Sequence, residues 1–329
     1  MGGQPGDSGE SGTGCLELEA DEVKEPVCCP LSEDLLESVR QLHNETCVYD
    51  PLDRETFRHK TLEDPDFDPA LAPVLVEDKR PVAWMMAVCR QEDGRVRAGV
   101  KMFGVAPDRR GMGLAHQLLR HVEAGCLARG AVSLDVGFTR PNYLTAGIDP
   151  RYTPAVAFLM RRGYQRTGET FNMDVDLSTS DWQAPELEEK LGSQGLVCRR
   201  LTPQDRGALE ACFDREGTSA GWRYQILRAA SLEPPRVFIA EREGEVVAFA
   251  AFDAVRPGWF GPMATSTGLR GGGIGTLVYL RCLQDMKSLG YQVAVINAVG
   301  PLPFYSRVSG AVVSRVFWRM SKQLAPSDS

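Results

Sequence analysis

Histidine is scarce in this sequence and absent from its second half. The 329 residues include only four histidines, and the last of them is His121. Histidine is the side chain that most often moves protons in enzymes. A reaction carried out by the second half therefore needs other groups, unless the two halves share a site.

Metal-binding and disulfide patterns are also missing. The nine cysteines include one adjacent pair, Cys28 and Cys29, but no Cys-x-x-Cys spacing. Structural metal sites and disulfide frameworks depend on such regular spacing. We therefore expect reduced, mostly buried thiols and no metal.

Further absences narrow the class of protein. No apolar run is long enough to cross a bilayer, and the N-terminal stretch lacks the basic and apolar segments of a secretory signal. Both absences favour a cytoplasmic protein without a membrane partner. The formal net charge of −7 disfavours nucleic acid as a partner and mildly favours a cationic substrate such as an amine.

What the sequence contains, twice, is a glycine-rich stretch. It reads Arg110-Gly111-Met112-Gly113-Leu114-Ala115 in the first half and Arg270-Gly271-Gly272-Gly273-Ile274-Gly275 in the second. The two arginines are 160 residues apart, and so are Gly130 and Gly290, which close the helical segment after each stretch. Internal similarity at one fixed interval indicates that one fold occurs twice.

The setting of the two stretches predicts a phosphate site in each half. Each stretch follows a strand-like run and opens an apolar, helix-like segment. The start of a helix directs several backbone N–H groups to one spot and adds partial positive charge there. Glycine leaves this backbone accessible because it has no Cβ.

The domain organisation follows from the repeat. We predict a disordered tail over residues 1–24, a first domain over 25–180 and a second domain over 195–325, with a polar linker between them. The first half carries 13 extra residues, which fall within 138–153. This insert either covers a binding cleft or forms a surface loop, and the sequence leaves both interpretations open.

Each half runs in the same order: two helices, a hairpin, a strand, the glycine stretch, a helix, a strand, a short helix and a closing strand. This order, together with the glycine stretches, resembles the GNAT superfamily of N-acetyltransferases. The segment Phe304-Tyr305-Ser306-Arg307, followed by Gly310, looks like the family's Phe-Tyr-x-x-x-Gly helix with one extra residue before the glycine. The tandem layout is similar to that of mycothiol synthase and of bacterial amino-sugar acetyltransferases.

Two other phosphate-binding folds fit the residues less well. A Walker loop needs Gly-Lys-Ser/Thr, which neither stretch has. A dinucleotide-binding fold places its glycine loop after the first strand, with an acidic residue about 20 residues later. Here a hairpin precedes each glycine stretch. Asp135 could be that acid in the first half, but the second half has Asn297 at the end of the matching strand.

The resemblance implies an α/β fold of two tandem GNAT domains, each a mixed twisted sheet flanked by helices. It implies acetyl-CoA as co-substrate and N-acetylation of the primary amine of a small molecule, with an amino sugar as one candidate, by a monomer or homodimer. The residues expected to contact the cofactor are the six positions of each glycine stretch and three strand ends, Val105, Thr265 and Asn297.

The resemblance also separates the two halves chemically. Tyr305 matches the family's general acid, which protonates the departing thiolate. The first half has Leu159 at that position, and leucine cannot donate a proton. The second half is therefore the better candidate catalyst, although Tyr143 or Tyr152 in the insert could replace the missing tyrosine.

Two further roles are predicted in the second half. Gly261-Pro262 should disturb its strand as a bulge does, which would leave the Met263 N–H free to hold the oxyanion of the tetrahedral intermediate. Asp253, at the end of a hairpin strand, is a candidate general base. Glu241, Asp214 and water remain alternatives to it.

Two other functions stay open at this point. One is a protein lysine acetyltransferase, which a broad, open cleft would favour and a closed pocket would oppose. The other is a non-catalytic acyl-CoA-binding or regulatory protein, which would bind acetyl-CoA without turning over any amine.

Overall fold

The computed structural model describes residues 1–2, 25–92 and 94–324 of the chain. Residues 3–24, which make up almost all of the predicted tail, lie outside the described residues, as do the last five positions.

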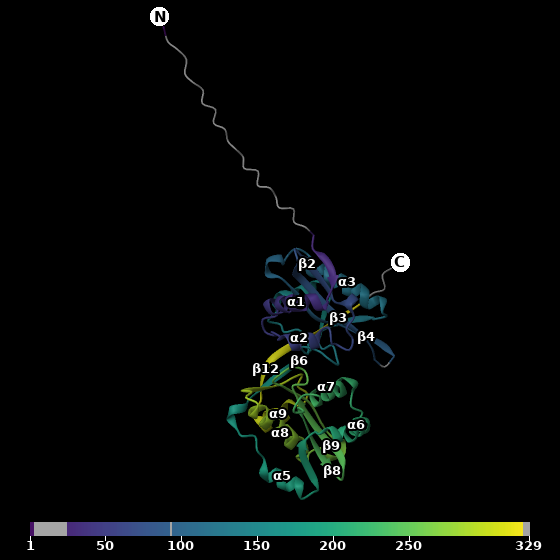
Figure 1. Ribbon diagram of the computed structural model, residues 1–329, viewed down its shortest axis with the longest axis vertical. Helices are drawn as coiled ribbons and strands as arrows, with labels where there is room; N and C mark the ends of the chain where they lie inside the picture. The colour runs from purple at the N-terminus through teal and green to yellow at the C-terminus, as the bar shows by residue number, and fades with distance from the viewer. Residues whose placement is uncertain (3–24, 93, 325–329) are drawn as a thin grey trace.

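The strands of both halves form one continuous twelve-stranded sheet (Figure 1). Its order is β1-β2-β3-β4-β5-β12-β6-β11-β10-β9-β8-β7. The sheet is mixed because β4–β5 and β10–β11 pair in parallel, whereas the other neighbours are antiparallel. The strands are β1 (Val27–Pro30), β2 (Pro73–Glu77), β3 (Arg80–Glu92), β4 (Arg95–Val105), β5 (Ser133–Val136), β6 (Gln165–Asp176), β7 (Leu196–Arg200), β8 (Val237–Arg242), β9 (Glu245–Phe252), β10 (Trp259–Thr265), β11 (Val293–Ile296) and β12 (Val312–Gln323).

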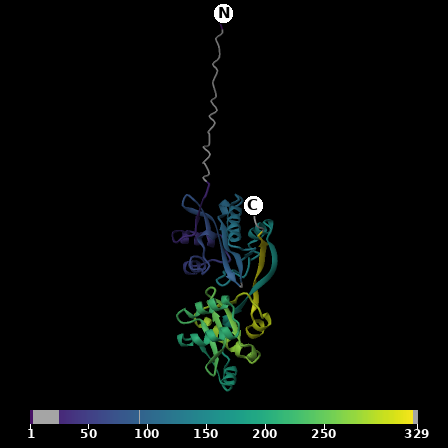
Figure 2. The ribbon, with the colours of Figure 1, turned by 90° about the vertical axis from the view of Figure 1, so that its right-hand side faces the viewer.

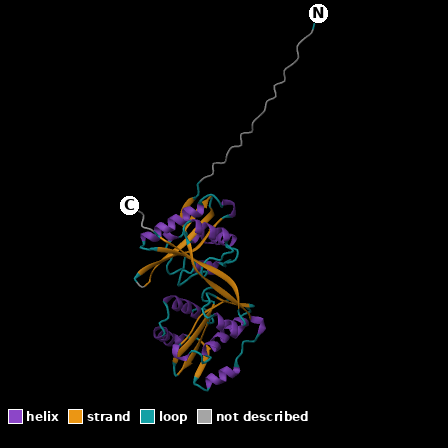
Figure 3. Ribbon diagram, turned by 180° about the vertical axis from the view of Figure 1, so that it is seen from behind, coloured by secondary structure: helices purple, strands orange, loops and turns teal. Residues whose placement is uncertain are grey.

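Helices cover both faces of the sheet (Figure 3). Within the described residues, no helix combines the length and apolarity that a membrane crossing needs. The helices are α1 (Glu33–Thr46), α2 (Arg54–Lys60), α3 (Leu114–Ala128), α4 (Thr153–Arg161), α5 (Pro185–Gly192), α6 (Arg206–Arg215), α7 (Ala220–Ala230), α8 (Ile274–Ser288) and α9 (Leu302–Ser309).

The helices divide between the faces in the same way in each half. In the second half, α6 and α7 pack on one face of β8 and β9, through Val237 and Ile239. Helices α8 and α9 pack on the opposite face, where Phe238 and Ala240 point. Because side chains alternate along a strand, this arrangement gives each half two separate hydrophobic cores, one on each side of the sheet.

The two closing strands are exchanged between the halves. The last strand of the chain, β12, pairs with β5 of the first half, where Met320 lies opposite Val136. The last strand of the first half, β6, pairs with β11 of the second half, where Met173 lies opposite Ile296. Figure 2 shows β12 in yellow crossing from the lower lobe to the upper one. The sequence predicted both closing strands but not this exchange.

The parallel pairs are very short. Strands β4 and β5 pair only through Gly99–Asp135 and Val100–Val136, and β10 and β11 only through Trp259–Val295 and Phe260–Ile296. Beyond these residues no strand pairing joins them, so a gap opens in the sheet of each half, at the carboxyl ends of the two parallel strands.

A bulge lies at the opening of each gap. In β10 the register with β9 shifts between Phe260 and Met263, so the irregularity predicted at Gly261-Pro262 is present. In β4 the register with β3 shifts between Val100 and Met102, which makes Lys101 the extra residue. Proline has no N–H and weakens a strand ladder, but the first half makes its bulge without one.

The exchange of strands predicts that the first half cannot fold alone. Residues 25–180 expressed as a fragment lack β12, so β5 and β6 would have no strand between them and Leu134 and Tyr164 would lose their Met320 neighbour. We expect this fragment to lack a cooperative thermal transition, measured by circular dichroism, and to regain one when coexpressed with residues 181–324. A stable, monomeric 25–180 fragment would contradict the exchange and support two independent domains.

Candidate functional site

Each half contains a cavity at the gap in its sheet. The first has a volume of about 1100 Å³ and is lined by the end of β4, the first glycine loop, α4 and the insert. The second has a volume of about 730 Å³ and is lined by β10, the second glycine loop, α7, α9 and the insert. The repeat of the sequence is therefore matched by a repeat of the site.

The glycine loops have the same geometry in both halves. Gly113 and Gly273 cap α3 and α8 in the left-handed conformation, with φ of 82° and 98°. The Arg110 Nε–H donates to the Val105 carbonyl at 3.3 Å, and the Arg270 Nε–H donates to the Thr265 carbonyl at 3.1 Å. Each arginine thus fastens its loop to the preceding strand, so that the start of the helix faces the cavity.

Both loops offer free backbone donors. Among the described residues, the N–H groups of Gly111, Met112, Gly271 and Gly272 have no hydrogen-bond partner. A Cβ added at Gly111 or Gly271 would meet no atom within 4 Å. These loops therefore fit a phosphate group, because N–H groups at a helix start and partial positive charge favour an anion.

The second loop has one neighbour that the first lacks. A Cβ placed on Gly273 would lie 2.8 Å from Leu187 Cδ1 of α5, whereas one on Gly113 would meet nothing within 4 Å. Helix α5 forms within the predicted linker and packs beside α8, where Glu188 forms an ion pair with Arg281. Helix α5 of the linker therefore packs against the second glycine loop.

Most residues predicted for the second half line its cavity. They come from β10, the glycine loop, the end of β11 and α9: Met263, Thr265, Arg270, Gly271, Gly273, Gly275, Asn297 and Tyr305. Gly272, which is exposed, and Ile274, which is buried in the core below the loop, do not line it. In the first half, Val105, Arg110, Gly111, Gly113, Leu114 and Ala115 line the larger cavity, and exposed Met112 does not.

Tyr305 is held with its ring in the core and borders the cavity. The residue is 6% exposed, and its ring packs edge-on against Phe260 and Tyr279. Its hydroxyl makes no hydrogen bond to another described residue. Burial raises the pKa of the Tyr305 phenol, so the group stays protonated well into the alkaline range.

The candidate base Asp253 does not line the cavity. Its carboxylate accepts a hydrogen bond from the Gly258 N–H at 2.7 Å and one from the Tyr291 hydroxyl at 3.1 Å, which orders the turn between β9 and β10. Burial raises the pKa of Asp253 above its ordinary value. The alternatives are also engaged elsewhere, since Glu241 pairs with Arg199 and Asp214 pairs with Arg223.

The insert lies between the halves and borders both cavities. Tyr143 lines the second cavity and donates a hydrogen bond to the Asn297 side chain. Leu144, Thr145 and Tyr152 line the first cavity. Of the two interpretations that the sequence left open, the structure supports a cover over binding clefts, because most of the insert is buried.

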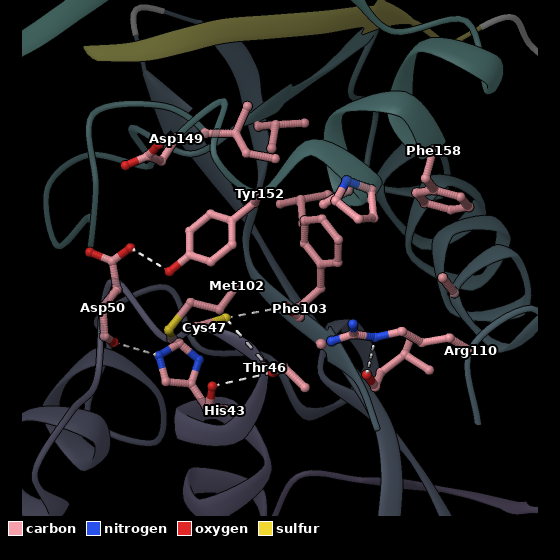
Figure 4. Close-up of a pocket in the computed structure, with 18 of the residues that line it drawn as sticks. His43, Thr46, Cys47, Asp50, Met102, Phe103, Arg110, Asp149, Tyr152 and Phe158 are labelled. Atoms are coloured by element: carbon pink, nitrogen blue, oxygen red, sulfur yellow. Dashed lines mark hydrogen bonds between the residues drawn. The ribbon is translucent and has the colours of Figure 1, made fainter. Parts of the chain in front are cut away.

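The first cavity has a different chemical character (Figure 4). Leu159 is fully buried in the core and does not line it, whereas Phe158 does. The Tyr152 hydroxyl donates to the Asp50 carboxylate at 3.0 Å and accepts from the Tyr49 N–H at 2.9 Å. Arg315 of β12 bonds both Asp50 and Asp149. Tyr152 and two acids at this cavity, Asp50 and Asp149, are therefore engaged in structural contacts.

Two copies of a mixed sheet with a gap between its parallel strands, each beside a glycine loop that opens a helix, define a tandem acyltransferase architecture. The sequence profile of the acetyltransferase (GNAT) family matches residues 36–164 and 203–309. The chain therefore belongs to this family. No curated protein matches the sequence significantly.

Solved structures share this architecture. A glucosamine N-acetyltransferase region of a fungal multi-domain beta-N-acetylglucosaminidase superposes with a TM-score of 0.74 at 16% identity, over 90% of this chain and 38% of that one. A tandem GNAT protein from the clavulanic acid biosynthesis pathway gives 0.65 at 18%, over 92% and 100%. A GCN5-related N-acetyltransferase from Sphaerobacter thermophilus gives 0.64 at 18%, over 91% and 96%. This chain thus spans less than half of the fungal protein, and such low identities show the fold alone.

A matched pair of substitutions, Gly272→Asp and Met112→Asp, tests the two loops. Both positions are exposed, and neither has a positive φ that an aspartate would strain. Each added carboxylate would repel a phosphate from its own loop. We expect acetyl-CoA to bind that half at least roughly tenfold more weakly, since one charge-assisted hydrogen bond contributes about 1.5–3 kcal/mol. Calorimetry measures affinity and stoichiometry.

The outcomes separate one site from two. Unchanged affinity and stoichiometry in both variants would remove the loops from the cofactor site. One bound acetyl-CoA per chain, lost in Gly272→Asp alone, would confine binding to the second half. We avoid Gly273 for this test because a side chain there would collide with Leu187.

Proposed function

We propose that this protein transfers the acetyl group of acetyl-CoA to the primary amine of a small molecule, and that the second cavity is the site of transfer. The observation that carries the proposal is the position of Tyr305, which borders the same cavity as Met263 and the second glycine loop. A proton donor, an oxyanion site and a phosphate site in one cavity are the parts that acyl transfer from a thioester requires.

The two faces of the sheet suggest how the substrates meet. The glycine loop and α9 lie on the face that α8 covers, and α7 lies on the other. The gap between β10 and β11 joins the faces. We infer that the pantetheine arm of acetyl-CoA enters from the α8 face and the amine from the α7 face, so that thioester and amine meet inside the sheet.

Two groups then act on the reacting atoms, and a third shapes the gap beside them. The Met263 N–H, beside the bulge, donates a hydrogen bond to the oxyanion that forms when the amine attacks the carbonyl carbon. Tyr305 donates its proton to the thiolate as the carbon–sulfur bond breaks. Asn297 holds the wall of the gap, because its Nδ2–H donates to the Phe260 carbonyl at 3.1 Å while its Oδ1 accepts from Tyr143.

The ammonium proton has to leave without a protein base. Among the described residues that line the second cavity, none is an aspartate, glutamate, histidine or lysine. We therefore assign this step to water, which carries the proton out of the cavity before the amine attacks. This assignment replaces Asp253, whose carboxylate lies at a turn outside the cavity.

The acceptor side of the cavity favours a small molecule over a protein lysine. Trp222 and Gln225 of α7 wall it on one side, and Phe138 and Tyr143 of the insert on the other. A polypeptide needs an open groove instead. An amino sugar remains a candidate acceptor, and the fungal structural neighbour that is described as a glucosamine N-acetyltransferase region supports it.

For the first half we propose a different role, that of a non-catalytic acyl-CoA site. Its glycine loop is as open as that of the second half, but Leu159 stands where the second half has Tyr305. A cavity with a phosphate loop and no tyrosine at the position of Tyr305 can bind the cofactor without completing transfer.

Tyr305→Phe tests the catalytic assignment. The change removes the hydroxyl and keeps the buried ring, so stability should change little. We expect kcat to fall about 10²–10⁴-fold, the usual contribution of a general acid, with little change in acetyl-CoA affinity. Steady-state kinetics and calorimetry provide the two readouts.

Tyr152→Phe is the matched variant in the first cavity. It should leave kcat close to wild type, because that hydroxyl is bonded to Asp50 and belongs to the other half. The reverse result, a loss in Tyr152→Phe with wild-type turnover in Tyr305→Phe, would move catalysis to the first cavity.

The pH dependence tests the absence of a protein base. We expect log(kcat/KM) for the amine to rise with pH until the pKa of the acceptor itself, which is about 10.4 for an alkyl amine. No fall should appear below about pH 10, the ordinary pKa of tyrosine, because burial raises the pKa of Tyr305 and keeps it in the acid form. A rising limb near pH 6–7 that stays fixed when the acceptor is changed would reveal a protein base.

A further inference from the structure

The second cavity is lined by charge of one sign only. Three arginines, Arg140, Arg270 and Arg307, contribute to its wall, and no acidic side chain does among the described lining residues. The first cavity differs, because Asp50 and Asp149 line it. The purely positive charge that lines the second cavity is therefore not a feature that the two halves share.

Two of these arginines belong to the cofactor side. Arg270 is bonded to the Thr265 carbonyl and forms part of the glycine loop. Arg307 lies on α9, three residues after Phe304, and Arg161 holds the matching place on α4, three residues after Phe158. A position shared by both cavities indicates a shared function, and we assign it to cofactor binding because both cavities have a glycine loop. Arg140 remains without such a role.

Arg140 lies on the acceptor side. It belongs to the insert, and its side chain passes over Gly221 of α7, whose added Cβ would lie 3.5 Å from Arg140 Cδ. Helix α7 covers the face of the sheet opposite to α8 and the glycine loop. Arg140 is therefore separated by the sheet from the loop that binds the phosphates of the cofactor.

The backbone around Arg140 is firmly held. The next residue, Pro141, accepts a hydrogen bond from the buried Gln225 Nε2–H at 2.9 Å. Asn142 is 2% exposed and donates to the His59 carbonyl at 2.7 Å. Tyr143 is fixed by Asn297. Arg140 itself is exposed, so a rigid segment presents one free side chain at the cavity.

The guanidinium group of Arg140 has no acidic partner among the described residues. It lies 5.0 Å from the centre of the Phe138 ring, and the guanidinium group of Arg319 lies 5.7 Å from the same ring. Arg319 has no ion pair with a described residue either. An unneutralised cation at the wall of a cavity attracts an anion, and the second cation on the same ring adds to this attraction.

We propose that the acceptor of the second cavity carries an acidic group, a carboxylate or a phosphate, in addition to its amine, and that Arg140 binds this group. The inference rests on the proposed function, since it assumes that the second cavity binds the acceptor. A guanidinium forms two parallel hydrogen bonds to a carboxylate or phosphate, and this pairing orients the ligand as well as attracting it. When Arg140 holds the acidic group on the α7 face, the amine of the same acceptor would point into the gap. Amino acids and phosphorylated amino sugars have this chemistry, whereas a neutral amino sugar does not.

Paired acceptors provide the test. The full-length protein is assayed with acetyl-CoA, by release of free thiol, on each common α-amino acid and its primary amide, and on glucosamine 6-phosphate and glucosamine. Each pair keeps the amine and differs in the acidic group. We expect at least one acid-bearing member to exceed its neutral partner about tenfold or more in kcat/KM. The pair that responds separates carboxylate from phosphate.

Arg140→Met then links the preference to one residue. We expect kcat/KM for the acid-bearing acceptor to fall about 10–100-fold, as for the loss of a charge-assisted pair, and that of its neutral partner to stay unchanged. Arg140→Lys should recover part of the loss. The KM for acetyl-CoA should not move. Arg206→Met, an exposed arginine on α6 outside both cavities, is the matched control and should behave as wild type.

Three results would overturn the inference. One is equal turnover of acid and neutral partners in the wild type, the second is an equal loss for both in Arg140→Met, and the third is a raised KM for acetyl-CoA in that variant, which would assign Arg140 to the cofactor.

Failure of the proposed function has a different signature. If no amine in the panel is acetylated, calorimetry with the same acids in the presence of CoA decides. Binding that Arg140→Met abolishes supports the anion site while refuting transfer, and no binding of any acid refutes the anion site.

Discussion

The site depends on one constraint, the early end of parallel pairing between β10 and β11. Strand β10 has a proline at 262, which has no N–H to donate, and its register with β9 shifts at this point. Pairing with β11 stops after Phe260 and Ile296, and the polar backbone beyond faces a cavity instead of a neighbouring strand. A fully paired sheet would keep the two faces apart, so no cavity could connect them there.

The exchange of β6 and β12 makes the two halves one structural unit. Each strand completes the sheet beside the other half's parallel pair, and the two strands pair with each other along most of their length. Arg315 of β12 consequently reaches Asp50 and Asp149 at the first cavity. The insert makes the reverse contact, because Tyr143 of the first half donates a hydrogen bond to Asn297 of the second. The second cavity is therefore lined in part by side chains of the first half, and two acids at the first cavity are held by an arginine of the second half.

Duplication produced two similar frameworks with different chemistry. Both halves keep the glycine loop, the arginine that fastens it and the gap in the sheet. They differ at one position of the short helix, where the second half has Tyr305 and the first has Leu159, and in whether acidic side chains line the cavity. The framework depends on backbone geometry, which many sequences satisfy, whereas chemistry depends on single side chains. A single side chain can therefore differ between the halves while the fold stays the same.

The sequence by itself determined the local features. The helix starts at the glycine loops and the bulge at Gly261-Pro262 follow from neighbouring residues, and the repeat at 160 residues and the contrast of Tyr305 with Leu159 follow from comparing the two copies. Only the tertiary structure decided that β6 and β12 change places, that Asp253 serves a turn, and that the insert sets Arg140 against α7. The alternation of side chains along a strand determines which of them are buried, but it does not determine which strand lies beside it. Likewise, 13 extra residues reveal an insert but not the surface that the insert covers.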